Sequence, residues 1–374
     1  MGRSESRKGY ALSDQTIRAV SADSHVNPPT EMWAEYLAPE FRDRAPVLER
    51  TDDGDFEVFE GTRRPLFALS NTAGRRPEEY TASVRRLEEL RPGAWSPADR
   101  LDDQDVDGVD AEILFGTAVG APLQSSDAAL TRAGYTAYNR WLADFCAHAP
   151  DRLVGMAYVP SDDPEDAVAE VRDAAGRGLR GAVLEHQPAT GEWASDEWTS
   201  LWEVLVELDW PAHLHVGPRS ATSWGRAAFI NGLVSSKLTM PLSLGGLVLN
   251  GVLAAHSGLK VVSVEGQIGW IPFWKYYIDH AYEKHRWHQD VHLPELPSTY
   301  IERQIWFTFM EDPPGIDERH ACGIDRIMWS SDYPHSETTW PHSQKIIGDI
   351  FERVPEDEVR KIVRDNCVSL YGLA

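Results

Sequence analysis

Short apolar runs along the chain alternate with longer segments in which apolar residues recur at helical spacing. Such a rhythm is typical of βαβ units and a parallel sheet. The apolar runs predict eight strands, at Ile17–Ala22, Ala111–Phe115, Leu153–Val159, Gly181–Glu185, Pro211–Val216, Lys260–Glu265, Ile305–Phe309 and Arg326–Ser331. Eight is the number of strands that closes a parallel barrel.

Helical patterns fill several of the intervals between these strands. They predict helices at Ala129–His148, Pro164–Arg177, Glu197–Leu208, Leu244–Ser257 and Trp270–Lys284. Gly178 and Gly258 follow two of the helices, where a left-handed cap ends a helix before the next strand. We therefore predict an α/β fold, a distorted (β/α)8 TIM barrel.

Three segments depart from the rhythm. Residues 1–15 are polar and are expected to form a disordered tail, so that a single domain spans 16–374. Residues 46–93 read as an insertion after the first strand: a hairpin around Asp52–Asp55, then a helix near Glu78–Leu90. Residues 217–240 are predicted to be a long loop after the fifth strand, at the barrel end where active sites form.

Composition narrows the functional classes. The net charge of −23, with no Lys/Arg stripe, argues against binding to nucleic acid or to an anionic membrane. No run of about 18 apolar residues suggests a transmembrane helix, and residues 1–15 do not resemble a secretory signal. The three cysteines, Cys146, Cys322 and Cys367, are scattered, which suits a reducing cytoplasm.

Chemistry-bearing side chains follow three of the predicted strands. Asp23 and His25 lie two residues apart at the end of the first strand, so both point to the same face. His213 and His215 repeat this spacing at the end of the fifth, and His215 is nearer the strand's C-terminal end. A carboxylate and imidazoles on one face suit a divalent ion such as Zn²⁺ or Mn²⁺. The Asp23–His25 pair alone is equally compatible with a hydrogen-bonded turn. A lone histidine at the end of the fifth strand would more often be a core residue, but two at strand spacing favour a site.

Asp332 follows the eighth strand, in the string WSSDYPH, which also contains His335. Such a carboxylate can bind metal or move a proton, although an Asx turn before Tyr333-Pro334 is the simpler interpretation of this segment alone. The ends of strands one, five and eight converge in a closed barrel. The combination therefore predicts one metal site rather than three unrelated turns.

Several strings together resemble the amidohydrolase-related family typified by aminocarboxymuconate-semialdehyde decarboxylase. They include SADSHVNPPTEMWAEYLAPEFRDRAP, RLDDQDVDGVDAEILF, HLHVG, VEGQIGWIPFW, IMWSSDYPHSETTWP and DNCVSLYGL, and the resemblance extends from about Val20 to Leu373. It implies a distorted barrel with one catalytic divalent metal, held by Asp23, His25, His215 and Asp332. Many relatives have His or Glu where this chain has Asp23.

The sixth strand departs from the family pattern. Many relatives have an acid/base histidine just after it, whereas this chain has Glu265, which could act as base, ligand or positioning group. His256 lies before that strand and is expected to be solvated. Glu185 and His186 end the fourth strand, where some amidohydrolases carry a carboxylated lysine. Because no lysine stands there, we expect a mononuclear site.

Further candidates lie around the predicted site. Asp332, Glu265, His213 and His335 are the candidate catalytic residues. Arg219 and Arg226 could pair with a substrate carboxylate, and Trp224 and Trp270 could flank a ring, although loop arginines are commonly solvated and most of the 14 tryptophans must be core or interface.

Two reactions and one binding role fit these observations. The leading interpretation is a hydrolase in which a metal-activated water attacks a small, carboxylated cyclic or aromatic substrate. The alternatives are a non-oxidative decarboxylase of a small aromatic or unsaturated carboxylate, and an inactive binding barrel. We expect one divalent ion, Zn²⁺ ahead of Mn²⁺ or Fe²⁺. The family also implies a homodimer or higher homo-oligomer, with which the aromatic segment Trp270–Tyr282 is compatible.

Overall fold

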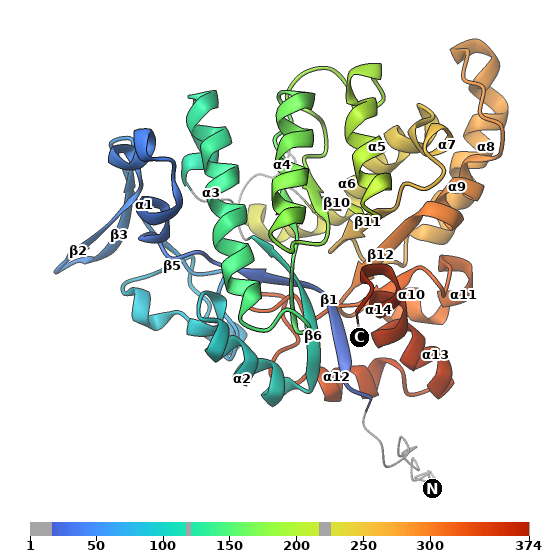
Figure 1. Ribbon diagram of the computed structural model, residues 1–374. Coiled ribbons are helices and arrows are strands. Elements are labelled where there is room, and N and C mark those ends of the chain that lie inside the picture. Colours follow the sequence, from blue (N-terminus) through green and yellow to red (C-terminus); the bar gives the residue numbers. More distant parts are fainter. Residues whose placement is uncertain (1–16, 117–120, 217–225, 374) are drawn as a thin grey trace, which may run out of the picture.

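The computed structural model describes residues 17–116, 121–216 and 226–373, and parallel strands occupy its centre (Figure 1). They pair in two sheets, ordered β1-β6-β7 and β8-β9-β10-β11-β12-β13. These strands are β1 (Ala19–Val26), β6 (Val109–Gly116), β7 (Leu153–Gly155), β8 (Ala157–Tyr158), β9 (Ala182–Leu184), β10 (Ala212–His215), β11 (Val261–Val264), β12 (Ile305–Phe309) and β13 (Ile327–Trp329). Because β7 and β8 are two parts of one extended segment, the nine strands fill eight positions, at the eight predicted places.

Backbone hydrogen bonds bridge both junctions between the two sheets. Next to β13 and β1, the amide of Asp332 donates to the carbonyl of Asp23 (3.0 Å). Between β7 and β8, the amide of Met156 still donates to Leu114 of β6 (3.0 Å), after which the strand turns to pair with β9. The strands therefore form the distorted barrel that the sequence predicts.

Helices surround the strands, and α3, α4 and α5 follow one another along one side of the barrel (Figure 1). The helices are α1 (Met32–Tyr36), α2 (Pro97–Asp107), α3 (Ala128–Ala147), α4 (Pro164–Gly176), α5 (Thr199–Glu207), α6 (Ala228–Leu249), α7 (Val252–Ala255), α8 (Ile271–Gln289), α9 (Pro297–Gln304), α10 (Pro313–Asp317), α11 (Arg319–Cys322), α12 (Ser343–Ile350), α13 (Glu356–Arg360) and α14 (Asn366–Tyr371).

Local sequence signals set the helix ends. Asp163 caps α4 by accepting hydrogen bonds from the amides of Glu165 and Asp166, and Pro164 occupies the first turn. Helix α2 begins after Ser96 in the same way and ends at Gly108, whose φ of 71° is a conformation that glycine adopts without strain.

The core has two layers, because successive strand residues point to opposite faces. One set packs against the helices and includes Ala19, Leu114 and Leu214. The other set fills the barrel interior, and residues of α14, including Tyr371, pack into the same cluster. Helix α14 thereby closes the barrel end away from the strands' C-terminal edge.

The insertion after β1 is an antiparallel sheet that projects from the barrel (Figure 1). The predicted hairpin is confirmed as β2 (Val47–Thr51) and β3 (Gly54–Phe59), and β4 (Thr62–Phe67) and β5 (Ser83–Val84) extend it. The predicted helix near Glu78–Leu90 is wrong: the segment contains only the short 3-10 turns η2 (Pro77–Glu79) and η3 (Leu87–Glu89) besides β5. Asp55 of β3 binds the amide of Leu87 (3.0 Å), which ties this segment to the sheet.

The prediction of a loop over 217–240 is wrong from residue 228 onward, where α6 begins, and the predicted helix Leu244–Ser257 is divided between α6 and α7. By length and composition α6 is able to cross a membrane. Its residues Met240, Leu244 and Leu247 are, however, part of the protein core. Pro241 and several glycines and serines within α6 disfavour a helix by sequence criteria, so the pattern did not predict one there.

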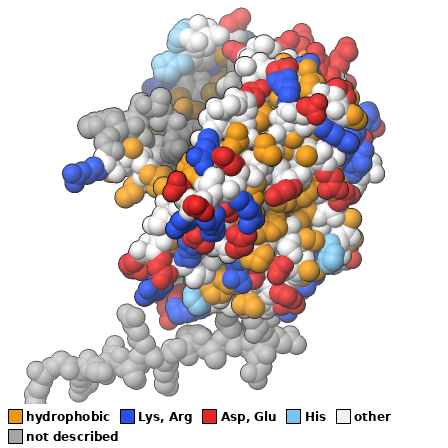
Figure 2. Space-filling model, turned by 90° about the vertical axis from the view of Figure 1, so that its left-hand side faces the viewer, with side chains coloured by type: hydrophobic (Ala, Val, Ile, Leu, Met, Phe, Trp, Pro, Cys, Tyr) orange, Lys and Arg blue, Asp and Glu red, His pale blue; other side chains and the backbone are white. Residues whose placement is uncertain are grey.

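The surface drawn in Figure 2 is densely charged, with acidic and basic side chains interspersed among apolar ones. Ion pairs such as Arg172–Glu207 (2.7 Å) join neighbouring helices, here α4 and α5. Exposed pairs of this kind contribute little to stability.

Candidate metal centre

Four predicted residues converge at the C-terminal ends of β1, β10 and β13. Nε2 of His25 lies 3.4 Å from Oδ1 of Asp23, 3.3 Å from Oδ1 of Asp332 and 3.2 Å from Nε2 of His215. The same nitrogen of His215 is 3.5 Å from Oδ1 of Asp23. Asp23, His25 and Asp332 are at most 2% exposed. These residues meet because the C-terminal ends of the strands in a barrel face one pocket.

Several polar atoms in this cluster are hydrogen-bond acceptors to which no described side chain around the cluster donates. Nδ1 of His215 faces the carbonyl of Val216 (3.1 Å), and Nδ1 of His25 faces that of Gly116 (3.4 Å). With Nδ1 as the donor, and with a cation in place of the Nε2 proton, each Nε2 would present a lone pair to that cation. Neither carboxylate oxygen of Asp23 receives a hydrogen bond from a described residue. Two imidazole nitrogens and two carboxylates in this state fit one divalent cation.

Glu265 adds a third carboxylate beside this group. Its Oε2 lies 3.8 Å from Nε2 of His215, while its Oε1 is bound by the ammonium of Lys237. Lys237 extends from α6, its side chain is 12% exposed, and it also contacts Glu337 (3.1 Å). The sequence prediction missed Lys237 because its segment was assigned to a loop.

His335 lies against the same group, as expected from its position three residues after Asp332 in the string WSSDYPH. Its Nδ1 is 3.1 Å from Oδ1 of Asp332, and its ring stacks on His25 with centroids 3.7 Å apart. His25, Glu265, Asp332 and His335 can each offer one ligand atom within 4.8 Å of the others. The centre can therefore hold one ion and still keep side chains free for acid–base chemistry.

The carboxyl groups of this cluster have different pKa values because their neighbours differ. Burial raises the pKa of Asp332, but the neighbouring His335 and His25 outweigh burial and lower it to about 2. Burial and the nearby Asp332 raise the pKa of Glu265 to about 7 against the opposing effect of Lys237. Burial lowers the pKa of His25, yet Asp23 and Asp332 outweigh it and raise it to about 10. The site is thus strongly attractive to positive charge.

Backbone strain accompanies two of these residues. Glu265 has a φ of 61° and Asp332 a φ of 52°, both in the left-handed region that non-glycine residues rarely occupy. Glu265 follows β11 directly, and Asp332 lies three residues after the end of β13. The turn aims the side chain across the barrel end instead of along the strand, a use of strain that is common at functional sites.

A buried polar network holds β1 in position beneath the centre. Arg100 of α2 donates to the carbonyl of His25 (2.8 Å) and pairs with Glu112 of β6. Glu112 accepts from Ser24 (3.0 Å), which lies 3.1 Å from Ser331. These contacts fix the backbone on both sides of the Asp23 and His25 side chains. The RLDDQDVDGVDAEILF string contains Arg100 and Glu112, but nothing in the sequence indicated that they meet.

His213 occupies a deeper layer of the barrel. It is fully buried, its Nδ1 faces the carbonyl of Ala182 (3.0 Å), and its Nε2 faces the hydroxyl of Tyr371 (2.8 Å). Burial lowers its pKa to about 3, so the ring is neutral. Because both nitrogens are engaged by the barrel interior, the geometry gives His213 a structural role and does not support the predicted catalytic one.

The structure describes two of the four predicted substrate residues, Trp270 and Arg226. Trp270 donates its indole N–H to the carbonyl of Gly266 (2.8 Å) and packs on Trp274 and Phe307, so it belongs to the core. Arg226 is exposed just before α6. Arg219 and Trp224 lie outside the described residues.

The remaining candidates support the mononuclear prediction. His186 lies between the hydroxyl of Ser243 (2.7 Å) and the carbonyl of His215 (2.7 Å), so both its nitrogens have partners. Neither it nor Glu185 is among the described residues that could share a metal.

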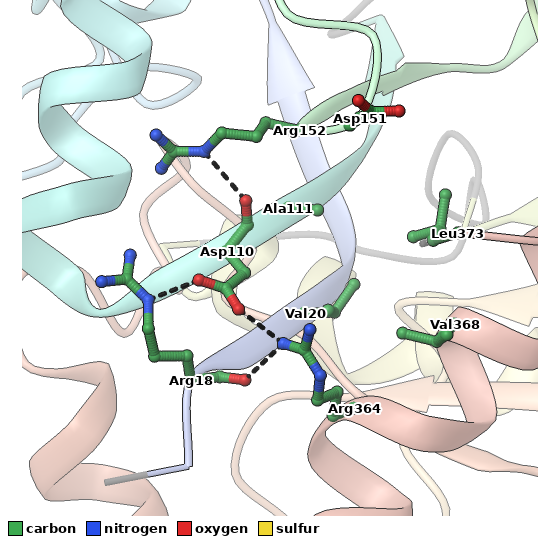
Figure 3. Close-up of a pocket in the computed structure, with 9 residues that line it drawn as sticks. All are labelled: Arg18, Val20, Asp110, Ala111, Asp151, Arg152, Arg364, Val368 and Leu373. Atoms are coloured by element: carbon green, nitrogen blue, oxygen red, sulfur yellow. Dashed lines mark hydrogen bonds and ion pairs between the residues drawn. The ribbon is translucent and has the colours of Figure 1, made fainter.

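A cavity of about 310 Å³ lies at the opposite end of the barrel (Figure 3). Arg18 and Arg364 both bind the carboxylate of Asp110 there, and Arg364 also donates to the carbonyl of Arg18 (2.9 Å). This cluster joins the start of β1, β6 and the C-terminal part of the chain.

The barrel and the acceptor cluster together define a metal-dependent barrel enzyme. The chain belongs to the amidohydrolase family, which matches residues 22–373. This confirms the resemblance to the aminocarboxymuconate-semialdehyde decarboxylase-like branch and disfavours the inactive barrel.

Known relatives agree with this assignment. The chain is 27% identical to a gamma-resorcylate decarboxylase of Rhodococcus jostii, over 63% of this chain and 75% of that protein. Its fold is similar to that of an amidohydrolase from Mycobacterium avium subsp. paratuberculosis, with a TM-score of 0.75 and 20% identity over 97% of this chain and 100% of the other. It is also similar to 5-carboxyvanillate decarboxylase from Novosphingobium aromaticivorans, complexed with manganese and 4-hydroxy-3-methoxy-5-nitrobenzoic acid (TM-score 0.70, 19% identity, 99% and 100% covered).

Proposed function

We propose that this protein is a metal-dependent, non-oxidative decarboxylase of a small hydroxylated aromatic carboxylate. The observation that carries the proposal is the donor-free cluster of Asp23, His25, His215 and Asp332 with a separate carboxyl group, Glu265, held beside it. The decarboxylase relatives support this reaction over the hydrolysis that the sequence favoured. The manganese bound to the Novosphingobium enzyme supports Mn²⁺ as a candidate ion in addition to Zn²⁺.

We assign the ion to His25, His215, Asp23 and Asp332. A divalent ion bound there would attract the substrate's oxygen atoms and neutralise their negative charge. Ser24 and Arg100 keep β1 in the position that this requires, as outer partners do in metal sites.

Glu265 is the proton donor in this proposal. Its carboxyl proton passes to the ring carbon that bears the substrate carboxylate, the bond from that carbon to the carboxylate breaks, and its electron pair returns to the ring as carbon dioxide leaves. Glu265 then regains a proton from water. A hydroxyl group on the ring favours the reaction because it raises the electron density at the carbon that takes the proton.

Lys237 is the positioning residue for this step. It binds Oε1 of Glu265 and so leaves Oε2 facing the cluster. Since Lys237 also binds Glu337, it holds α6 against the barrel end.

The test is a panel of hydroxybenzoates and carboxyvanillate-type acids incubated with protein loaded with Mn²⁺ or Zn²⁺. We expect carbon dioxide release, and in D2O one deuterium at the carbon that lost the carboxylate. Incorporation of oxygen-18 from labelled water into the organic product would instead establish hydrolysis and overturn the proposal.

A further inference from the structure

Glu185 continues the inner face of the fourth barrel strand. It directly follows β9, in which Ala182 and Leu184 belong to the layer that packs against the helices. Val183, between them, belongs to the layer that fills the barrel interior. Because residues two apart on a strand share a face, Glu185 points to the same side as Val183, at the C-terminal end of the barrel.

Strand pairing places Glu185 level with a residue of the metal centre. Strands β9 and β10 are parallel, and Val183 is paired with His213. Two residues further along both strands, this register brings Glu185 level with His215. Neighbouring strands lie about 4.8 Å apart, so Glu185 stands beside His215 at the end of the barrel where the centre lies.

The phenol of Tyr158 provides a second indication of where Glu185 lies. Burial raises the pKa of Tyr158, and the negative charges of Glu185 and Asp23 add to this effect, so both carboxylates are near the phenol. The hydroxyl of Tyr158 donates its proton to the carbonyl of Gly116 (2.9 Å). Glu185 is therefore on the side of the metal centre, and Tyr158 does not supply it with a hydrogen bond.

The carboxylate of Glu185 has no partner, whereas its backbone is fixed. Its side chain is exposed, and no hydrogen bond or ion pair joins the carboxylate to another residue in the described parts of the chain. The indole of Trp193 donates to its carbonyl (3.0 Å), and the ring of the next residue, His186, contacts the carbonyl of His215 (2.7 Å). An acceptor on such a fixed backbone is held ready for a donor that a ligand brings.

We propose that Glu185 accepts a hydrogen bond from a second hydroxyl group on the ring of the substrate, and so selects dihydroxybenzoates. This inference rests on the proposed function, since it takes the substrate to be a hydroxylated aromatic carboxylate. A hydrogen bond to a carboxylate is stronger than one between neutral groups. An acid that lacks the second hydroxyl leaves Glu185 unpaired, and an acid with a second carboxylate there meets a like charge.

The test measures dissociation constants, because a second hydroxyl also changes the reactivity of the ring. Titration calorimetry is done on Mn²⁺-loaded Glu265→Gln protein, in which the ligand is not consumed, with salicylate and the four dihydroxybenzoates that share its hydroxyl group. We expect the best dihydroxybenzoate to bind at least about tenfold more tightly than salicylate. Adding Glu185→Ala should abolish this preference and change salicylate binding less than about twofold. Glu192→Ala is the matched control, because Glu192 is an exposed carboxylate of the same loop, and it should keep the preference.

A dicarboxylate provides a readout of the opposite sign. Hydroxyisophthalate should bind about fivefold more tightly after Glu185→Ala, as expected when one of two like charges about 4 Å apart in water is removed. A merely structural Glu185 would weaken both ligands on substitution. Glu185→Gln covers the case in which Glu185→Ala fails to fold, and it should relieve the repulsion equally.

The outcomes separate this inference from the reaction. Binding of salicylate without a preference for any dihydroxybenzoate, or a preference that survives Glu185→Ala, would overturn the role of Glu185 and leave the proposed function standing. If none of these acids binds the metal-loaded protein, the proposed function fails and the role of Glu185 fails with it.

Discussion

Glu265→Gln separates the proposed acid from the metal site. The amide keeps the size of the side chain, and its oxygen can still accept from Lys237, which also retains Glu337. Helix α6 therefore stays docked. Only the transferable proton is lost, and a positioned acid contributes about 10²–10⁴ in rate. We expect kcat to fall by that factor, equivalent to about 2.7–5.4 kcal/mol in the barrier.

Two measurements decide this prediction. The first is kcat from carbon dioxide release, with Glu337→Gln as the matched control: it removes the other carboxylate on Lys237 but leaves Glu265 in place. The second is metal content by elemental analysis, which should equal that of the wild type. A variant that keeps more than about a tenth of wild-type kcat refutes the assigned acid, and one that loses its metal shows that Glu265 is a ligand.

Three further outcomes are expected. His215→Ala should weaken Mn²⁺ binding, measured by titration calorimetry, by more than the about 10–100-fold typical of losing an outer partner; unchanged binding would remove His215 from the site. At a pH above the pKa of about 7 of Glu265, where this group is ionised, Lys237→Met leaves a buried carboxylate unpaired and should lower the free energy of urea unfolding of metal-free protein by about 3 kcal/mol. Lys237→Arg should change it little; equal effects would contradict the buried ion pair. The buried His213 has a pKa of about 3, so between pH 6.5 and 3 the unfolded chain binds one proton that the folded chain does not. Stability should fall by about 1.4 kcal/mol per pH unit of acidification from this group, and His213→Gln should reduce the measured slope by that amount; an identical slope would contradict a neutral His213.

The strands were predictable because each is a short apolar run whose burial on both faces leaves little room for polar residues. The same register placed Asp23 and His25 on one face, and likewise His213 and His215. The sequence pattern does not indicate how deep in the barrel each side chain lies. His213 and His215 lie one layer apart in the barrel. His215 is therefore part of the cluster, whereas His213 contacts the hydroxyl of Tyr371.

The part of α6 before Leu244 could not be predicted, and Lys237 was missed with it. Its sequence is apolar nearly all around, so it lacks the one-sided periodicity of an ordinary surface helix. The helix prediction for residues 78–90 was wrong for the opposite reason: the Glu and Arg residues of this segment favour a helix locally. Asp55, about 30 residues earlier, binds Leu87 and Arg86 and holds the segment extended instead. This second error therefore comes from a partner distant in sequence.

The plug formed by α14 has a consequence for the order of folding. Tyr371 contacts His213 from below, and Arg364 binds Asp110 and the backbone of Arg18. The strand that carries Asp23 and His25 is therefore anchored by a residue 346 positions later in the sequence. Because closing so long a loop costs conformational entropy before its contacts repay it, we expect the floor of the barrel to be among the last parts of the fold to form.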